Sequence, residues 1–120
     1  MKRGSEEAFA AADDALTRGA YLEAFEIAKP WVDEGHDWAE SCIGSLYQCG
    51  LGVKQDLEEA VRLFRRAADH GSAGAWYSLG VIYDVGGVNM PPNPELAGAF
   101  YQKARELGYF PGQPYIRPLR

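Results

Sequence analysis

The residues of this chain that could take part in chemistry are a glycine-rich loop, two histidines and two cysteines. The loop LGVKQD, residues 51–56, contains the glycines and the lysine of a phosphate-binding loop. Such a loop also requires a preceding strand and a Lys-Ser/Thr pair that opens a helix, and neither is found here. We therefore interpret Gly50, Gly52, Gly86 and Gly87 as helix ends.

The histidines and cysteines suggest no catalytic or metal site. His36 and His70 each lie beside a glycine at an expected helix end, where an imidazole can donate to terminal carbonyls. Cys42 and Cys49 are separated by seven residues, about 10 Å of helical rise, which is too far for a disulfide. We expect two buried, unpaired thiols, and no metal, cofactor or catalytic residue.

Size and charge exclude several functional classes. With 120 residues, of which 47% are hydrophobic, the chain is expected to form one globular domain. A net charge of -5 and scattered basic residues argue against nucleic acid as a partner. The cluster of Arg62, Arg65 and Arg66 is interpreted as a solvated helix face beside Glu58 and Glu59. The sequence has neither the roughly 20 apolar residues of a membrane span nor a signal-peptide core, which predicts a cytoplasmic protein without a membrane partner.

An internal repeat is the strongest pattern in the sequence. One set of residues recurs after 36 positions and a second set after 37. In order, the pairs are Gly44 and Gly80, Tyr47 and Tyr83, Gly50 and Gly86, Ala60 and Ala97, Phe64 and Tyr101, Ala67 and Ala104, and Gly71 and Gly108. Such periods are typical of stacked supersecondary units. We expect three units, at residues 5–35, 36–71 and 72–108.

Each unit has the pattern of two helices joined by a turn. In the second unit Asp56 and Glu59 form a capping-box pattern, and in the third Asn93 precedes Pro94 at an expected helix start. The sequence therefore predicts an all-α fold with about six helices. Its architecture would be an α-α superhelix, a short α-solenoid of about three helix-turn-helix repeats within residues 1–108.

The repeated segments resemble a known family. The stretches IGSLYQCGLGVKQDLEEAVRLFRRAADHG and LGVIYDVGGVNMPPNPELAGAFYQKARELG are similar to Sel-1-like repeats, the longer-period relatives of tetratricopeptide repeats. The resemblance implies a non-enzymatic protein–protein interaction module, an adaptor or scaffold that binds a protein or peptide partner in a concave groove. The alternative is a small enzyme or ligand carrier that uses the groove as a pocket, which a deep cavity with several titratable groups would favour.

The resemblance also implies which residues bind the partner, because the first helix of each pair lines the concave surface in tetratricopeptide-like stacks. The predicted partner-binding residues are Trp38, Ser41, Ser45 and Gln48 from the second unit, Tyr77, Val81 and Asp84 from the third, and Phe9, Asp13 and Leu16 from the first. A competing interpretation is that Phe9, Trp38 and Tyr77 pack against neighbouring repeats.

The tail YFPGQPYIRPLR, residues 109–120, is expected to be non-helical because Pro111, Pro114 and Pro118 cannot sustain a helix. It is nevertheless apolar. We expect it either to cover the open end of the last helix pair, as a solenoid cap does, or to mediate self-association or partner binding as an extended segment.

Overall fold

Six helices follow one another in the computed structural model of this chain, which describes residues 4–87 and 89–109. They are α1 (Gly4–Arg18), α2 (Tyr21–Asp33), α3 (Asp37–Cys49), α4 (Leu57–Asp69), α5 (Ala73–Val85) and α6 (Pro94–Glu106). These described residues include no strand, although an isolated bridge joins Gly87 and Met90 between α5 and α6. The predicted all-α fold is confirmed.

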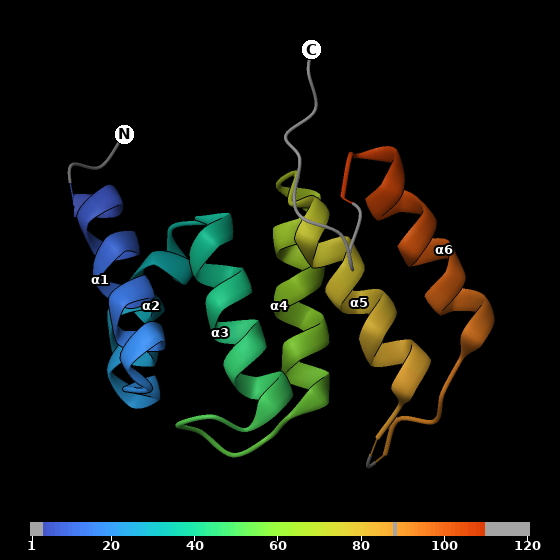
Figure 1. Ribbon diagram of the computed structural model, residues 1–120, viewed down its shortest axis with the longest axis horizontal. Coiled ribbons are helices and arrows are strands. Elements are labelled where there is room, and N and C mark those ends of the chain that lie inside the picture. The colour runs from blue at the N-terminus through green and yellow to red at the C-terminus, as the bar shows by residue number, and fades with distance from the viewer. Residues whose placement is uncertain (1–3, 88, 110–120) are drawn as a thin grey trace.

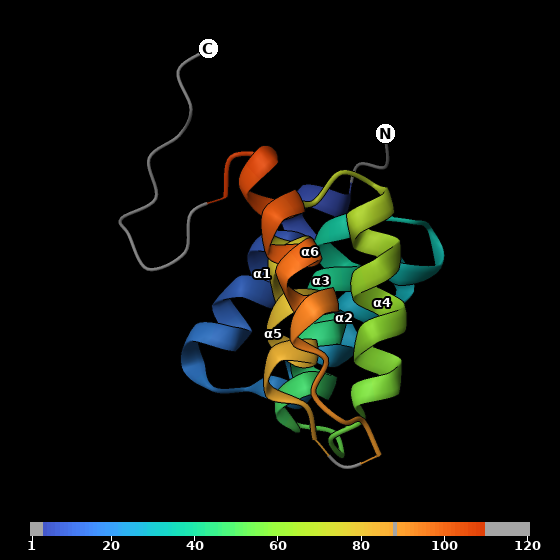
Figure 2. The same ribbon diagram turned by 90° about the vertical axis from the view of Figure 1, so that its right-hand side faces the viewer.

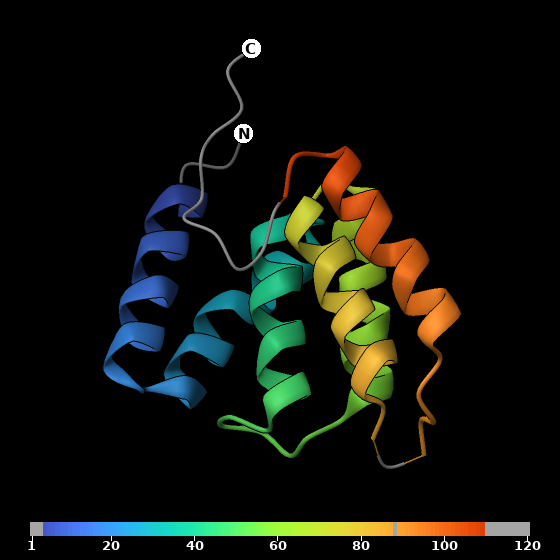
Figure 3. The same ribbon diagram turned by 45° about the vertical axis from the view of Figure 1, so that its right-hand side comes forward.

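The helices form three hairpins that follow one another along the long axis of the molecule, from α1 and α2 at one end to α5 and α6 at the other (Figure 1). Packing is most extensive between helices that are neighbours in the sequence. Figure 3 shows the first helix α5 in front of the second helix α4, with α3 beside them. This arrangement, in which each hairpin contacts chiefly the next, is that of a solenoid.

The turn of the second unit is built from the predicted stop and cap residues. Gly50 ends α3 in the left-handed conformation, with φ 68°, and the Asp56 carboxylate accepts from the Glu59 backbone N–H at 3.1 Å to begin α4. The Asp56 N–H donates to the Tyr47 carbonyl at 2.9 Å, and the Glu59 carboxylate pairs with Arg62. The predicted capping box is therefore only half formed.

The third unit repeats this connection with other residues. The Asn93 side chain accepts from the Leu96 N–H at 3.1 Å, with Pro94 at the first helical position. The Asn93 N–H donates to the Tyr83 carbonyl at 2.7 Å, as Asp56 does to Tyr47. The longer loop therefore keeps the same type of helix cap and the same hydrogen bond back to the first helix.

Two glycines interpreted above as helix ends have a different role. A Cβ on Gly52 would lie 2.7 Å from the Leu22 backbone nitrogen, and a Cβ on Gly87 would lie 2.5 Å from the Leu57 side chain. Gly52 requires glycine, because its φ is 76° and the backbone of another element approaches it, whereas a side chain at Gly87 would have to displace the end of the Leu57 side chain. At Gly52 this contact joins the α3–α4 loop to the start of α2, so it holds two units together.

Small and large residues alternate in the core, as the repeat predicts. The Phe64 ring packs against Gly44, and the Tyr101 ring packs against Gly80 in the next unit. Phe64, Leu63 and Leu79 are almost fully buried. The cysteines differ from expectation, because Cys42 is only partly buried and Cys49 is exposed.

The predicted tail lies outside the described residues, except for Tyr109. This residue follows α6 and is not helical, and its backbone N–H donates to the Ala104 carbonyl at 3.0 Å. In the described part of the chain, no helix is both long and apolar enough to cross a bilayer.

Candidate protein-interaction surface

The first-helix face, defined here as the side of the stack formed by α1, α3 and α5, carries most of the predicted partner-binding residues. Trp38 connects two of these helices. Its ring lies 5.4 Å from that of Phe9, and its indole N–H donates to the buried Ser5 hydroxyl at 3.3 Å. Ser5 also contacts His36 Nδ1 at 3.1 Å. Trp38 is partly buried, while Phe9 remains 52% exposed.

Asp13 and Leu16 extend this region along α1. Leu16 packs against the core between the first two units, whereas Asp13 is exposed. The neighbouring Cys42 thiol has a pKa raised to about 11, chiefly by burial and secondly by the charge of Asp13. This thiol is therefore protonated and weakly nucleophilic at neutral pH.

A small pocket lies near the ends of α3 and α5, where Gln55 of the α3–α4 loop and Leu57 of α4 also line it. It has a volume of about 140 Å³, and its lining includes the predicted residues Gln48 and Val81. Val85, which the sequence analysis did not select, also lines it and is 71% exposed. Ser41 is partly buried and Ser45 exposed on α3.

Tyr77 and Asp84 are turned towards α6 rather than towards α3. The Tyr77 ring lies 5.3 Å from that of Tyr101 and 5.2 Å from that of Tyr109. The Tyr101 hydroxyl donates to Asp84 Oδ2 at 3.2 Å. Burial first, and then this hydrogen bond to a carboxylate, raise the pKa of Tyr101 to about 12. The structure thus places the ten predicted residues in two groups, one along α1 and α3 to the pocket and one at the end of the stack.

A buried ionic cluster was missed by the sequence analysis. Glu40 is fully buried on α3, where its Oε1 contacts His70 Nδ1 at 2.9 Å and its Oε2 lies 3.2 Å from Arg66 Nε, an ion pair without a well-directed hydrogen bond. Arg66 also donates to the Val32 carbonyl at 3.2 Å. The interpretation of Arg66 as part of a solvated face was therefore wrong, because it connects three helices. Arg62 does pair with Glu59 at the surface.

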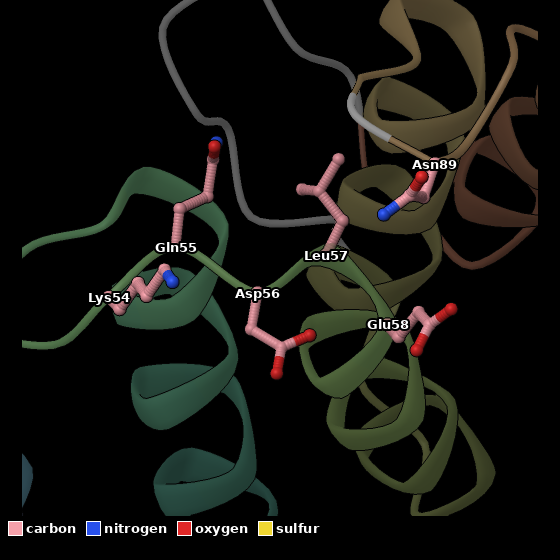
Figure 4. Close-up of a pocket in the computed structure, with 6 residues that line it drawn as sticks. All are labelled: Lys54, Gln55, Asp56, Leu57, Glu58 and Asn89. Atoms are coloured by element: carbon pink, nitrogen blue, oxygen red, sulfur yellow. The ribbon is translucent and has the colours of Figure 1, made fainter.

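A polar pocket of about 290 Å³ lies where α4 begins (Figure 4). Its lining comes from residues 54–58 and from Asn89 in the α5–α6 loop. The Asp56 carboxylate caps α4, so the most prominent acid of this pocket already has a structural role. Among the described residues, no group of three or more His, Cys, Asp or Glu side chains is arranged to hold a metal ion.

Comparison with known proteins identifies the repeats. The family model of the Sel1 repeat matches residues 43–72 and 75–109. Chitin synthase regulatory factor 2 of Schizosaccharomyces pombe is 33% identical over 72 residues, which are 60% of this chain and 14% of that protein.

Two solved structures share the fold. A Sel1 repeat protein from Oxalobacter formigenes superposes with a TM-score of 0.74 at 27% identity, over 85% of this chain and 40% of its own. A protective antigen of uropathogenic Escherichia coli strains with an SLR fold gives a TM-score of 0.65 at 25% identity, over 72% of this chain and 18% of its own. This chain thus corresponds to less than half the length of each of these proteins. Since the two matched repeats cover more than half of the sequence, the chain belongs to the Sel1 repeat family.

Proposed function

We propose that this chain is a non-enzymatic adaptor or scaffold module that binds a protein or peptide partner along its first-helix face. Proteins built from Sel1 repeats generally mediate protein–protein interactions. The observation that supports this site best is the continuity of the face. Phe9 and Trp38 join α1 to α3, and the pocket lined by Gln48 and Val81 joins α3 to α5.

The distribution of charge supports a basic partner. Arg18 is the one basic residue on α1, α3 and α5, whereas the exposed acidic residues on these helices are Glu6, Glu7, Asp13, Asp14, Asp37 and Asp84. The second helices carry eight acidic residues but also six basic ones, Lys29, Arg62, Arg65, Arg66, Lys103 and Arg105, so they are less acidic overall than the first helices. A partner with lysine or arginine beside a few apolar anchors would match the first-helix face and would be steered towards it.

The three pockets described among the placed residues are small. The pockets described above have volumes of about 140 and 290 Å³, and a third, between α2, α3 and α4, has about 130 Å³. Sites for small molecules are usually enclosed clefts of about 300–1,000 Å³. A pocket of 140 Å³ suits one apolar side chain of a partner.

The test compares apolar residues on the first-helix face with an equally exposed apolar residue on a second helix. The partner is first captured from the native cell extract and identified, and its affinity is then measured for Phe9→Ala, Trp38→Ala and Leu22→Ala. Leu22 is the matched control, because it is 54% exposed on α2 and Phe9 is 52% exposed on α1. We expect the Phe9 and Trp38 variants to weaken binding by about 1–3 kcal/mol.

The Leu22 variant should bind as the original chain does. Equal affinities for all three variants would refute the first-helix face as the binding site. A large fall in melting temperature for Trp38→Ala, with unchanged affinity of the folded molecules, would make Trp38 a packing residue.

A further inference from the structure

The last helix pair has a face that resembles an internal contact surface without its neighbour. Phe64 is 1% exposed because it packs in a core cluster with Ala75 and Leu79 of the following unit. Tyr101 occupies the same register position 37 residues later, against Gly80, but is only partly buried. No further helix pair covers it among the described residues. We call this surface, at the end seen in Figure 2, the terminal face.

The terminal face lacks the large aliphatic side chains that would pack against another repeat. In the second unit Leu57, Val61 and Ala68 pack against the core shared with the third unit. Their register equivalents in the third unit are the exposed residues Pro94, Gly98 and Arg105. Without large aliphatic side chains, a fourth helix pair could bury little apolar area there.

An aromatic strip remains on this face. The rings of Tyr101, Tyr77 and Tyr109 follow one another with centroid separations of 5.3 and 5.2 Å, and Tyr77 is in the middle. The carboxylate of Asp84 adjoins the strip through its contact with the Tyr101 hydroxyl. Aromatic surfaces of this kind bind extended proline-containing segments, whose rigid polyproline II conformation is already ordered before binding. A neighbouring carboxylate adds a site for arginine.

The chain itself supplies a segment of this composition at this place. The Tyr109 N–H donates to the Ala104 carbonyl as the Ser72 N–H donates to Ala67, so the chain leaves α6 where another first helix would begin. Residues 110–120, FPGQPYIRPLR, then contain prolines, apolar side chains and two arginines. The sequence FPGQ favours a β-turn, with proline and glycine at its central positions, which would send the chain back over the strip.

We propose that the terminal face is a docking site for an extended proline-containing segment, and that its occupant is residues 110–120 of the same chain. Seven residues after the turn span about 22 Å as polyproline II, close to the roughly 20 Å length of a 13-residue helix such as α5. Arg117 and Arg120 supply positive charge for Asp84. Direct attachment gives the segment an effective concentration in the millimolar range, which favours it over a second copy.

The experiment compares the full chain with a form that ends at Tyr109, and a synthetic peptide of residues 110–120 is added to each. Binding is followed by NMR through the amide and ring signals of residues 74–101. We expect the peptide to bind the shortened form at the tyrosine strip and not to bind the full chain, whose site is occupied. A peptide with Pro114→Ala and Pro118→Ala should bind about fivefold more weakly or worse.

Asp84→Asn in the shortened form provides the second variant, since it keeps the size of the side chain while removing the charge. This substitution should weaken binding of the peptide, with little change in the circular dichroism spectrum of the shortened form. Three results would overturn the proposal: no binding to the shortened form, equal binding to both forms, or signals that depend on protein concentration together with a dimer in sedimentation. The last result would make a second copy the occupant. These measurements involve no external partner, so they do not depend on the proposed function.

Discussion

At the scale of single residues, the same pair of register positions makes two different kinds of interaction in the second and third units. Glu40 in the second unit and Trp76 in the third are equivalent, and so are Arg66 and Lys103. Arg66 lies 3.2 Å from the Glu40 carboxylate, while the Lys103 ammonium lies 5.9 Å above the Trp76 ring. A cation on the second helix therefore meets either an acid or an aromatic ring on the first. The repeat pattern could not predict this, because neither position carries the same residue twice.

The buried position of Glu40 makes Arg66 and Arg62 a matched pair for mutation. Arg66→Ala would leave a fully buried carboxylate with His70 as its remaining ionic contact, which we expect to cost about 3 kcal/mol of unfolding free energy. Arg62→Ala removes a surface pair with Glu59 and should cost less than about 1 kcal/mol. Both values are measured by urea unfolding.

A third variant, Glu40→Leu, separates charge from packing in the same experiment. This variant removes the buried charge together with its requirement for partners. It should therefore lose less unfolding free energy than Arg66→Ala. Equal losses of unfolding free energy for the Arg66 and Arg62 variants would contradict this account, because removing a partner of the buried carboxylate would then cost no more than removing a surface ion pair.

At the scale of helices and turns, the sequence was most informative where backbone geometry demands particular residues. Gly50 was predicted as a helix end because few residues adopt the left-handed conformation, and Asn93 with Pro94 was predicted as a helix start. Gly52 and Gly87 were misinterpreted, because their constraint comes from Leu22 and from Leu57 in other elements. A contact between distant segments leaves no local signature in the sequence.

Two glycines should respond in opposite ways to substitution by alanine, because one lies in the contact between α5 and α6 and the other faces open space. A Cβ on Gly80 would lie 2.6 Å from the Tyr101 ring, so Gly80→Ala must displace that ring or separate the helices. We expect a loss of about 1–3 kcal/mol. Gly98 lies inside α6 with no described atom within 4 Å of an added Cβ, so Gly98→Ala should stabilise the protein by about 0.5–1 kcal/mol.

Thermal or urea unfolding of the two variants against the original chain measures both effects. Destabilisation by Gly98→Ala would contradict the open space beside this position in the described part of the chain. A neutral Gly80→Ala would show that the Tyr101 ring moves freely, which its hydrogen bond to Asp84 argues against.

At the scale of the whole molecule, the order of the helices and the stacking of the units followed from the repeat, because each hairpin can bury its apolar faces only against the next. The partner surface could be predicted less completely. Trp38 and Val81 were selected by their place on the first helix of each pair, as the family resemblance implied, but which neighbours cover a side chain depends on the stacking geometry. Tyr77 illustrates this, since it contacts Tyr101 of α6 and Tyr109 beyond it.

The helix pairs bury apolar side chains of different size, and this predicts that local stability differs along the stack. Val32, at 8% exposed, is the largest buried residue of α1 and α2, whose other buried residues are alanines and Ser5. The later units bury Leu46, Phe64 and Leu79, each of which contributes about 1.5–3 kcal/mol. Pro30 also removes a backbone hydrogen bond from α2.

We therefore expect native-state hydrogen exchange to be at least about tenfold faster for α1 and α2 than for α4 and α5, since local opening there exposes less apolar surface. Two alanine-to-glycine substitutions test whether the units open separately. Ala28→Gly on α2 should accelerate exchange mainly in residues 4–33, and Ala104→Gly on α6 mainly in residues 73–106, because both alanines are buried in second helices. If each substitution instead accelerated exchange in all six helices equally, the three hairpins would unfold as one cooperative unit. The nearest-neighbour description of this stack would then be wrong.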